Sequence, residues 1–425
     1  MRSLADWLSY QQRAHPRAVD LSLERVSSVA ARLGLLQRRA SLVTIGGTNG
    51  KGSTAMTLAC LLQACGQRVG LFTSPHLVRY NERIRIDGTA VSDSDLVSAF
   101  EHIEAVRGEV TLTFFEYNAL AALELFRRAQ LDAMVLEVGL GGRLDATNIL
   151  SADVAVVCSI GFDHRDWLGD TLDQIGAEKA GIFRAGQKVV LGTPDMPASV
   201  WQAASALNCE VWSAGREFSC TLRPSSDAAA AAWDYHSTLC ELSALPAPSL
   251  AGSIQYQNAA SALTALQLLN APHRCERARV ISGLEQVRLP GRFQVVPGEI
   301  EWILDVAHNE PAAEVLARAL RERRAARRTW AVFGTLSDKD SAAIALQLDG
   351  EIDRWVLTGI GDDPRGLSAT MLRERLPALR GEVELADDVL SACQRARAQA
   401  RAGERVVVLG SFHVVGPALA WLGLY

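Results

Sequence analysis

The chain has 425 residues, 48% of them hydrophobic and 21% charged, which indicates a globular protein with more than one domain and excludes a disordered chain. Its net charge of −5 gives no general attraction for nucleic acid or anionic lipid, and its eight scattered cysteines, without a Cys-x-x-Cys pair, argue against a disulfide framework or a structural zinc site. Residues 1–13 lack the apolar core of a signal peptide and no run reaches the roughly 18 apolar residues of a membrane span, so we expect a cytoplasmic protein with no nucleic-acid and no membrane partner.

The first two expected elements are helices. Residues 4–12 follow a short amphipathic pattern, and a second helix is expected to open at Asp20 and to run to about residue 33. Aspartate is a favourable N-cap residue, so capping is the simplest role for Asp20.

A glycine-rich turn follows the first expected strand, at residues 42–45, and precedes a buried helix at residues 55–62. The turn reads Gly-Thr-Asn-Gly-Lys-Gly-Ser at residues 47–53. Glycines allow backbone N–H groups to approach phosphate oxygens, and a helix N-terminus adds positive potential there. We expect Lys51 to reach the β- and γ-phosphates of a nucleotide, and a hydroxyl of Ser53 or Thr54 to face Mg²⁺. The spacing departs from the common phosphate loop, so a tight strand-to-helix turn is the alternative interpretation.

Polar residues follow three further expected strands, at residues 68–72, 132–138 and 153–158. Ligands of α/β proteins bind at the carboxyl edge of a parallel sheet, where such residues lie. Ser74 offers a hydroxyl to Mg²⁺ or serves as a turn residue. Glu137 ends an apolar strand and is the natural second ligand, since a buried carboxylate without a partner is costly. His164 is by itself more typical of a hydrogen-bonded structural histidine, because Mg²⁺ prefers oxygen.

The remaining elements of the first half are less specific. Residues 111–117 lead into a helix that is expected to end near residue 128, and the adjacent aromatics beside Glu116 are either core plus cap or a stacking surface. The helix at residues 173–183 carries Lys179, for which an ordinary ion pair is the simplest role. Residues 213–250 form a surface excursion of short strands, and Asn258 is placed to cap the long helix that follows.

Proline and glycine at residues 289–294 predict a hinge between two domains. Arg292, in this hinge, is either a ligand-binding residue or a surface arginine that packs between domains. Strands are expected at residues 302–306, 329–334, 354–358 and 405–409, and helices at 311–324, 341–347, 368–376 and 389–401. We interpret the basic run at 321–328 as a solvated helix end. The predicted fold class is α/β with two domains: an N-terminal P-loop ATPase domain at 1–290 and a C-terminal Rossmann-like domain at 291–425, with the active site between them.

Several of these motifs resemble those of the ATP-dependent Mur ligase superfamily, and more narrowly those of the folylpolyglutamate synthase and dihydrofolate synthase family. The similar segments are residues 47–53, Ser-Pro-His-Leu at 74–77, Glu-Val-Gly-Leu-Gly-Gly at 137–142, Asp-His at 163–164, Pro-Gly-Arg-Phe at 290–293 and Asp-Val-Ala-His-Asn at 305–309. The resemblance covers essentially the whole chain in the right order. One departure is Glu310, which stands where the family usually has a proline after the asparagine.

The resemblance implies an enzyme that uses ATP to join L-glutamate to dihydropteroate and then to reduced folates, through an acyl phosphate. It implies Mg²⁺, as two ions, and a Lys179 carbamylated by CO₂. Catalytic roles are implied for Lys51, Lys179 and His164, and metal binding for Ser74, Glu137 and His164. The implied nucleotide-binding residues are Thr48, Asn49, Gly50, Lys51, Gly52, Ser53, Asn258, Arg292 and Asp305. The implied pterin-binding residues are Ala18, Val19, Asp20, Leu21, Thr113, Phe114, Phe115, Glu116, Leu144, Asp145 and Ala146.

Two alternatives to this function are another amino-acid ligase of the Mur superfamily and an ATP-binding sensor that ligates nothing. A sensor needs no metal-binding residues around a transferable phosphate, so Glu137, His164 and Lys179 argue against it. We also expect the protein to be a monomer.

Overall fold

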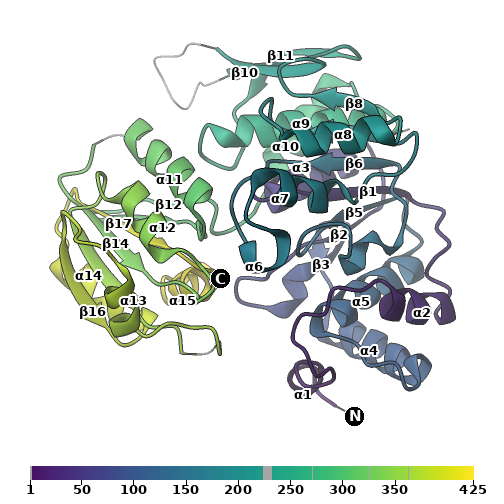
Figure 1. Cartoon of the computed structure of the whole chain (residues 1–425). Coiled ribbons are helices and arrows are strands. Elements are labelled where there is room, and N and C mark those ends of the chain that lie inside the picture. Colours follow the sequence, from purple (N-terminus) through teal and green to yellow (C-terminus); the bar gives the residue numbers. More distant parts are fainter. Residues whose placement is uncertain (1, 224–231, 270, 324, 362) are drawn as a thin grey trace.

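The computed structural model describes residues 2–223, 232–269, 271–323, 325–361 and 363–425, and these form two lobes, each built on its own sheet (Figure 1). The first lobe holds an eight-stranded sheet in the order β4-β3-β2-β5-β1-β6-β7-β8. Neighbouring strands in the series β2, β5, β1, β6, β7 and β8 pair in parallel. At the β2 edge, β3 and β4 extend the sheet as an antiparallel hairpin. The bounds are β1 Ser41–Gly46, β2 Val69–Phe72, β3 Ile84–Ile86, β4 Thr89–Ala90, β5 Ala133–Glu137, β6 Val154–Val157, β7 Lys188–Leu191 and β8 Glu210–Ser213.

Helices cover both faces of this sheet. Val43 and Ile45 point to the face covered by α3 (Lys51–Ala64), α9 (Ile254–Leu268) and α10 (Arg277–Gln286), whereas Leu42 points to the other face. The apolar run of β1 is continuous because a strand of such a sheet is buried on both sides. The opposite face is covered by α4 (Asp93–Arg107), α5 (Phe114–Ala129), α7 (Leu172–Ala180) and α8 (Ala198–Ala206), and α1 (Leu4–Gln11) and α2 (Glu24–Arg32) pack on α4.

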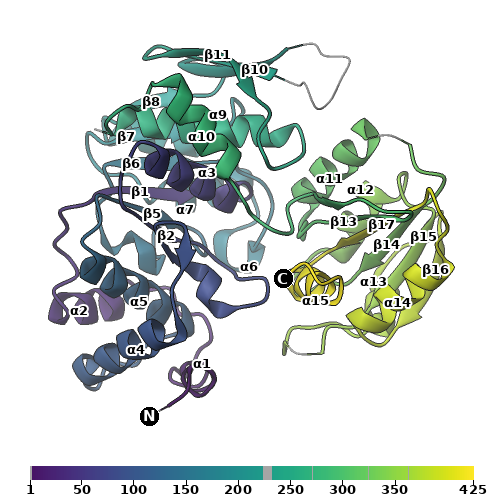
Figure 2. The ribbon, with the colours of Figure 1, turned by 180° about the vertical axis from the view of Figure 1, so that it is seen from behind.

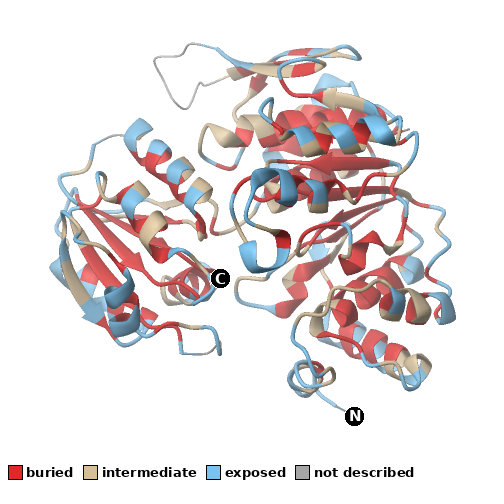
Figure 3. Ribbon diagram, viewed as in Figure 1, coloured by how far each residue is buried: buried red, intermediate tan, exposed pale blue. Residues whose placement is uncertain are grey.

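The second lobe, green to yellow in Figures 1 and 2, is a smaller doubly wound unit, as expected. Its six strands follow the order β12-β13-β17-β14-β15-β16, and all pair in parallel except β12 with β13. The strands are β12 Gln294–Val296, β13 Glu301–Leu304, β14 Thr329–Phe333, β15 Arg354–Thr358, β16 Glu382–Ala386 and β17 Arg405–Leu409. One face carries α11 (Glu310–Glu322), α12 (Ser341–Leu348) and α13 (Ala369–Arg375), and the other carries α14 (Val389–Gln399) and α15 (Phe412–Trp421). Figure 3 shows the central strands of both lobes buried beneath these helices.

A separate three-stranded sheet lies above α9 in Figure 1. It consists of β9 (Phe218–Leu222), β10 (Ala232–Ser237) and β11 (Glu241–Pro246), so the short strands expected over residues 213–250 are present. Trp233 and Tyr235 anchor it, because both are fully buried in the core that contains α9. Ser225, Ser226, Asp227 and the alanines at 228–231 lie outside the described residues.

Two predicted helix caps are wrong. The helix α2 begins at Glu24, and the Asp20 carboxylate lies 3.2 Å from His15 Nε2 and 3.3 Å from Arg25 Nη1. Asn258 lies inside α9, which begins at Ile254, and its amide donates to Gln255 Oε1 at 3.0 Å. In both cases the polar side chain pairs with a side chain in the first turn of the helix instead of capping its N–H groups.

The segment after β2 contains two elements that were not predicted: Tyr80–Arg83 form a 3-10 turn, and β3 returns along the edge of the sheet. Ile84 is fully buried there, which provides the apolar reason for an added strand. The helices α4, α10 and α15 and the strands β12 and β16 were not predicted. Among the described residues, no helix combines the length and hydrophobicity needed to cross a bilayer.

Candidate active site

A cavity of about 230 Å³ lies where the carboxyl ends of β1, β2, β5 and β6 face the second lobe. Both lobes line it, since Asp305, His308 and Phe412 come from the second lobe. The position agrees with the expected cleft at the carboxyl edge of the sheet. Every residue predicted for nucleotide binding, metal binding or catalysis lines this one cavity: Thr48, Asn49, Gly50, Lys51, Gly52, Ser53, Ser74, Glu137, His164, Lys179, Asn258, Arg292 and Asp305.

The glycine-rich turn joins β1 to α3 through backbone angles that favour glycine. Gly47 has a φ of 136° and Gly50 a φ of 86°, and a Cβ on Gly50 would lie 2.7 Å from Asn258 Oδ1. The helix α3 begins directly afterwards at Lys51, so its first N–H groups have no acceptor within the helix and face the cavity. This arrangement suits an anion, because the unpaired N–H groups and the helix dipole act together.

Lys51 curls back over the turn that precedes it. Its Nζ donates to Gly47 O at 3.0 Å and to Thr48 O at 3.1 Å. Of the two hydroxyls considered for the metal, Ser53 lines the cavity, whereas Thr54 is fully buried and accepts from Cys158 Sγ at 3.4 Å. The geometry therefore favours Ser53.

The side chains of Thr48 and Asn49 hold the turn in place. Thr48 Oγ1 donates to Gly161 O and accepts from Gly161 N, both at 3.0 Å. The Asn49 N–H donates to Ser159 Oγ at 3.1 Å, and its amide exchanges hydrogen bonds with Asn309 of the second lobe at 3.0 and 3.1 Å. The phosphate-binding turn is thus bonded directly to both lobes.

Glu137 stands at the end of β5 beside Ser74. Its Oε2 accepts from the Ser74 N–H at 3.0 Å, and no hydrogen bond to its Oε1 is found among the described residues. Burial raises the pKa of Glu137, although the nearby charges of Lys51 and Arg292 oppose this effect. A bound cation would stabilise the charged form of such a buried carboxylate.

The donor set fits Mg²⁺ only together with a nucleotide. Glu137 and Ser74 provide hard oxygen donors, and His164 provides a nitrogen whose pKa burial lowers to about 4, so that it stays neutral. Within the described ranges, no group of three His, Cys, Asp or Glu side chains is placed to hold a metal by itself. The missing ligands would be phosphate oxygens and water, which is how Mg²⁺ commonly binds in nucleotide sites.

Lys179 is buried on α7, and its Nζ donates to Gly47 O at 3.1 Å. Burial, helped by the charge of Lys51, lowers its pKa to about 7. The ordinary ion pair considered for this lysine is absent from the described part of the chain. A substantial neutral fraction near pH 7 makes the amine a nucleophile.

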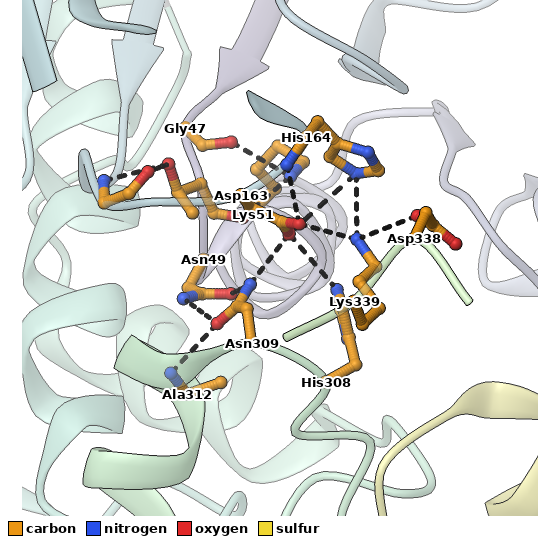
Figure 4. A network of polar contacts seen from close by, with 12 residues as sticks. Gly47, Asn49, Lys51, Asp163, His164, His308, Asn309, Ala312, Asp338 and Lys339 are labelled. Carbon is orange, nitrogen blue, oxygen red and sulfur yellow. Dashed lines mark hydrogen bonds and ion pairs between the residues drawn. The ribbon is translucent and has the colours of Figure 1, made fainter. Parts of the chain in front are cut away.

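Asp163 is the centre of a network that joins the lobes, and the prediction of site residues missed it (Figure 4). Its carboxylate pairs with Lys339 Nζ at 2.5 Å and accepts from Asn309 Nδ2 at 2.8 Å. Burial raises the pKa of Asp163, but the His308 hydrogen bond and the charges around it outweigh burial and hold that pKa well below its usual range. Lys339 Nζ also lies 3.5 Å from His164 Nε2. Only its position next to His164 could have indicated Asp163.

Lys339→Met is expected to lower the free energy of unfolding by roughly 3 kcal/mol, because it leaves the buried Asp163 carboxylate without its main counter-charge. Urea unfolding of each lobe, followed by its own tryptophans, measures the loss. Combining it with Asp163→Asn should recover part of that loss, since the uncompensated charge is then removed. Fully additive effects of the two changes would contradict a direct pair.

The predicted pterin-binding residues form a neighbouring group outside the cavity. Thr113 and Glu116 form the capping box of α5, so the core-plus-cap interpretation describes them. Arg25 links Glu116 at 3.2 Å to Asp20 at 3.3 Å. This brings residues distant in sequence into one charged cluster.

Two backbone contacts connect this group to the cavity. Phe115 packs so closely on Gly139 that a Cβ there would lie 2.4 Å from the ring, and Asp145 accepts from the N–H groups of Gly139 and Leu140 at 3.0 and 2.9 Å. Both Gly139 and Leu140 line the cavity. The rings of Phe114 and Phe115 and the side chains of Val19, Leu21 and Leu144 are half-buried, Ala18 is exposed and Ala146 is buried.

Known proteins resemble this chain along nearly its whole length. The family model for the Mur ligase middle domain matches residues 45–266, and that for the Mur ligase glutamate ligase domain matches residues 291–412. The Escherichia coli (strain K12) protein named dihydrofolate synthase/folylpolyglutamate synthase is 43% identical over 412 residues, 97% of this chain and 94% of that protein. The resemblance predicted from the motifs is therefore confirmed.

Solved structures agree with that similarity. The structure of E. coli FolC in complex with DHPP and ADP has a TM-score of 0.92 at 42% identity and covers 99% of this chain and 98% of its own. A bifunctional folylpolyglutamate synthase/dihydrofolate synthase with Mn, AMPPNP and L-glutamate bound has a TM-score of 0.89 at 41% identity and covers 100% and 99%. The predicted two-domain α/β fold class is confirmed by these matches.

Proposed function

Because the chain belongs to the Mur ligase family, and within it to the dihydrofolate synthase/folylpolyglutamate synthases, we propose that it joins L-glutamate first to dihydropteroate and then to reduced folates at the expense of ATP. It is an ATP-dependent ligase that uses a divalent cation. The observation that carries this function is the cavity of about 230 Å³ between the lobes, which gathers the phosphate loop, Ser74, Glu137, His164 and Lys179.

The reaction we assign to this cavity has two steps. The carboxylate of the pterin substrate attacks the γ-phosphate of ATP in line and forms an acyl phosphate with release of ADP. The amine of L-glutamate then attacks the activated carbonyl, forms the amide bond and releases phosphate. Lys51 and the N–H groups of the phosphate loop stabilise the charge that develops on the transferred group.

The cation site is assigned to Ser74, Glu137 and His164, with Mg²⁺ as the physiological ion and a second ion near His164. When bound, Mg²⁺ neutralises the phosphate oxygens during transfer. The other roles belong to residues of the chain. Glu137 and Ser74 border the cation site, and Arg292 of the hinge and Asp305 of the second lobe contact the nucleotide. The second lobe also excludes water, which would otherwise hydrolyse an acyl phosphate.

We assign the pterin to the half-buried aromatics Phe114 and Phe115 beside the charged cluster of Asp20, Arg25 and Glu116. A flat heterocycle can stack on such rings, and a buried carboxylate can bind its ring N–H groups. Gly139 and Leu140 line the nucleotide cavity and contact this group through Phe115 and Asp145, so a substrate held there would lie next to the cavity with its carboxylate toward the γ-phosphate.

Lys179 is proposed to be carbamylated, because its lowered pKa of about 7 supplies the neutral amine that CO₂ requires. Protein equilibrated with ¹³C-bicarbonate at pH 8 is expected to give a carbamate ¹³C resonance that Lys179→Met lacks. Carbamylation should weaken as the pH falls below 7, because the amine then becomes protonated. Lys188→Met is the matched control and should keep the resonance, since Lys188 bonds Leu268 O away from the cavity. An unchanged spectrum in Lys179→Met would exclude the modification.

We place the domain boundary between residues 290 and 291, within the expected hinge. We also expect the protein to be a monomer, to lie in the cytoplasm and to bind no nucleic acid. All eight cysteines are free thiols, which suits a reducing compartment. Light scattering after gel filtration tests the monomer directly.

An acceptor panel tests the function. ADP release over many turnovers should require both L-glutamate and a pteroate-type or reduced-folate acceptor. ADP release with UDP-linked muropeptide acceptors instead would assign the chain to the cell-wall ligases of the same family. Nucleotide binding without release in any combination would support a sensor.

A further inference from the structure

The loop between β2 and β3 carries Ser74; Tyr80 anchors it in the core of the first lobe, and Leu77 also contacts the second lobe. Leu77, three residues after Ser74, packs against the apolar core that lies under α14 and α15. Its Cδ1 would lie 3.4 Å from a Cβ placed on Gly291, next to Val306 and Val415. A side chain of the first lobe is thus part of the packing of the second.

The backbone of α15 touches the backbone of this loop at Gly416. A Cβ on Gly416 would lie only 2.1 Å from Leu77 O and 3.1 Å from Leu77 C. Gly416 lies inside the helix and has ordinary helical backbone angles, so glycine is required here only because there is no space for a Cβ. Any larger residue must displace either the loop or the helix.

A carboxylate inside the loop receives a second contact from the same lobe. Glu82 accepts from the N–H groups of Leu77, Val78 and Arg79 at 2.8, 2.8 and 2.6 Å. Tyr425, which follows α15, donates its hydroxyl to Glu82 Oε1 at 2.5 Å. Glu82 therefore both shapes the loop and adds a second attachment of the loop to the second lobe.

The other end of the loop is fixed at the cation site, where the Ser74 N–H donates to Glu137 Oε2 at 3.0 Å. The loop is therefore a short connection with Glu137 at one end and α15 at the other. A shift of α15 must move Leu77, because the two are in contact at Gly416. Since only Pro75 and His76 lie between Leu77 and Ser74, we expect the displacement to reach Ser74.

We propose that Gly416 and Tyr425 are positioning residues that set the place of the Ser74 hydroxyl beside Glu137, so that the second lobe controls divalent-cation binding to the enzyme–nucleotide complex. The inference rests on the proposed function only in taking Ser74 and Glu137 as cation ligands. It adds a role for two residues of the second lobe that do not line the nucleotide cavity.

The test is direct Mn²⁺ binding to the full-length protein with AMPPNP, followed by the electron paramagnetic resonance signal of free Mn²⁺. Gly416→Ala is expected to raise the Mn²⁺ dissociation constant about 10-fold or more, in the range typical for residues that orient metal ligands. AMPPNP affinity in EDTA should stay within twofold of the unmodified protein, because Gly416 itself does not line the nucleotide cavity. Gly350→Ala is the matched control, since a Cβ there meets nothing within 4 Å.

Tyr425→Phe keeps the test decisive if Gly416→Ala folds poorly. It removes one hydroxyl and should raise the Mn²⁺ dissociation constant about threefold without changing AMPPNP affinity in EDTA. Leu77→Ala should act like Gly416→Ala, and Leu77→Met, which retains the apolar contact, should restore tight Mn²⁺ binding.

The inference is overturned if Gly416→Ala and Tyr425→Phe bind Mn²⁺ as tightly as the unmodified protein, or if they weaken AMPPNP equally with and without the metal. Failure of the proposed function has a different signature: the unmodified protein would then release no ADP in the acceptor panel, whatever the variants do to Mn²⁺ binding.

Discussion

Lys51→Ala is expected to lower kcat by about 10³-fold, which corresponds to about 4 kcal/mol of transition-state stabilisation. The lysine lies at the start of α3 among N–H groups that face the cavity, and its ammonium already bonds Gly47 O and Thr48 O. This preorganised positive charge is placed where negative charge develops during phosphoryl transfer. Glutamate-dependent ADP release under saturating substrates measures the loss.

The fold should survive the Lys51→Ala substitution. Lys51 is only half-buried, and its contacts are to carbonyl oxygens rather than to a buried carboxylate. Far-ultraviolet circular dichroism and the thermal midpoint should therefore stay close to those of the unmodified protein. Lys188→Ala, which removes a lysine at the start of β7 that bonds Leu268 O and does not line the cavity, should retain full turnover. Unchanged turnover in Lys51→Ala would remove the assignment of residues 47–53 as the phosphate loop.

Glu137→Gln is expected to lower kcat by about 10³-fold and to abolish measurable Mn²⁺ binding with AMPPNP. The amide keeps the shape of the side chain and the oxygen that accepts from the Ser74 N–H, so the change removes charge and little else. ADP affinity in EDTA should be no weaker, because one negative charge next to the phosphate site is lost while Lys51 and Arg292 remain.

The matched control for this substitution is Glu404→Gln. Glu404 is also a buried glutamate and accepts from Trp330 Nε1 at 2.9 Å, but it lies in the second lobe away from the cavity. Its amide variant should keep both Mn²⁺ binding and turnover. If Glu137→Gln retained tight Mn²⁺ binding, the cation would have to sit elsewhere.

The parallel strands and their ligands were predictable because local patterns encode them. The apolar runs of β1, β5 and β6 mark strands buried on both faces, and polar residues directly after such strands must share one edge of the sheet. Glu137, Ser74 and the phosphate loop therefore meet in one cavity, as expected. Their chemical roles remain predictions that the substitutions above test.

The partners of individual side chains were not predictable in the same way. The caps assigned to Asp20 and Asn258 failed because α2 begins at Glu24 and α9 at Ile254, and the two side chains pair instead with Arg25 and Gln255 in the first turns of these helices. The short strand β3 was missed because its pairing depends on the exposed edge of β2 rather than on its own pattern. Such choices are made by whichever neighbour the fold brings within hydrogen-bond range.

The sequence by itself determined the two-lobed α/β architecture, the glycine-rich phosphate loop and the carboxylate at the end of β5, because periodicity, backbone freedom and strand order are local properties. Only the tertiary structure decided that Asp163 and Lys339 hold the lobes together and that Gly416 touches Leu77. An ion pair between residues 176 positions apart, or a close backbone approach between still more distant ones, leaves no periodic trace in the chain, since it exists only after both lobes have formed around their own cores.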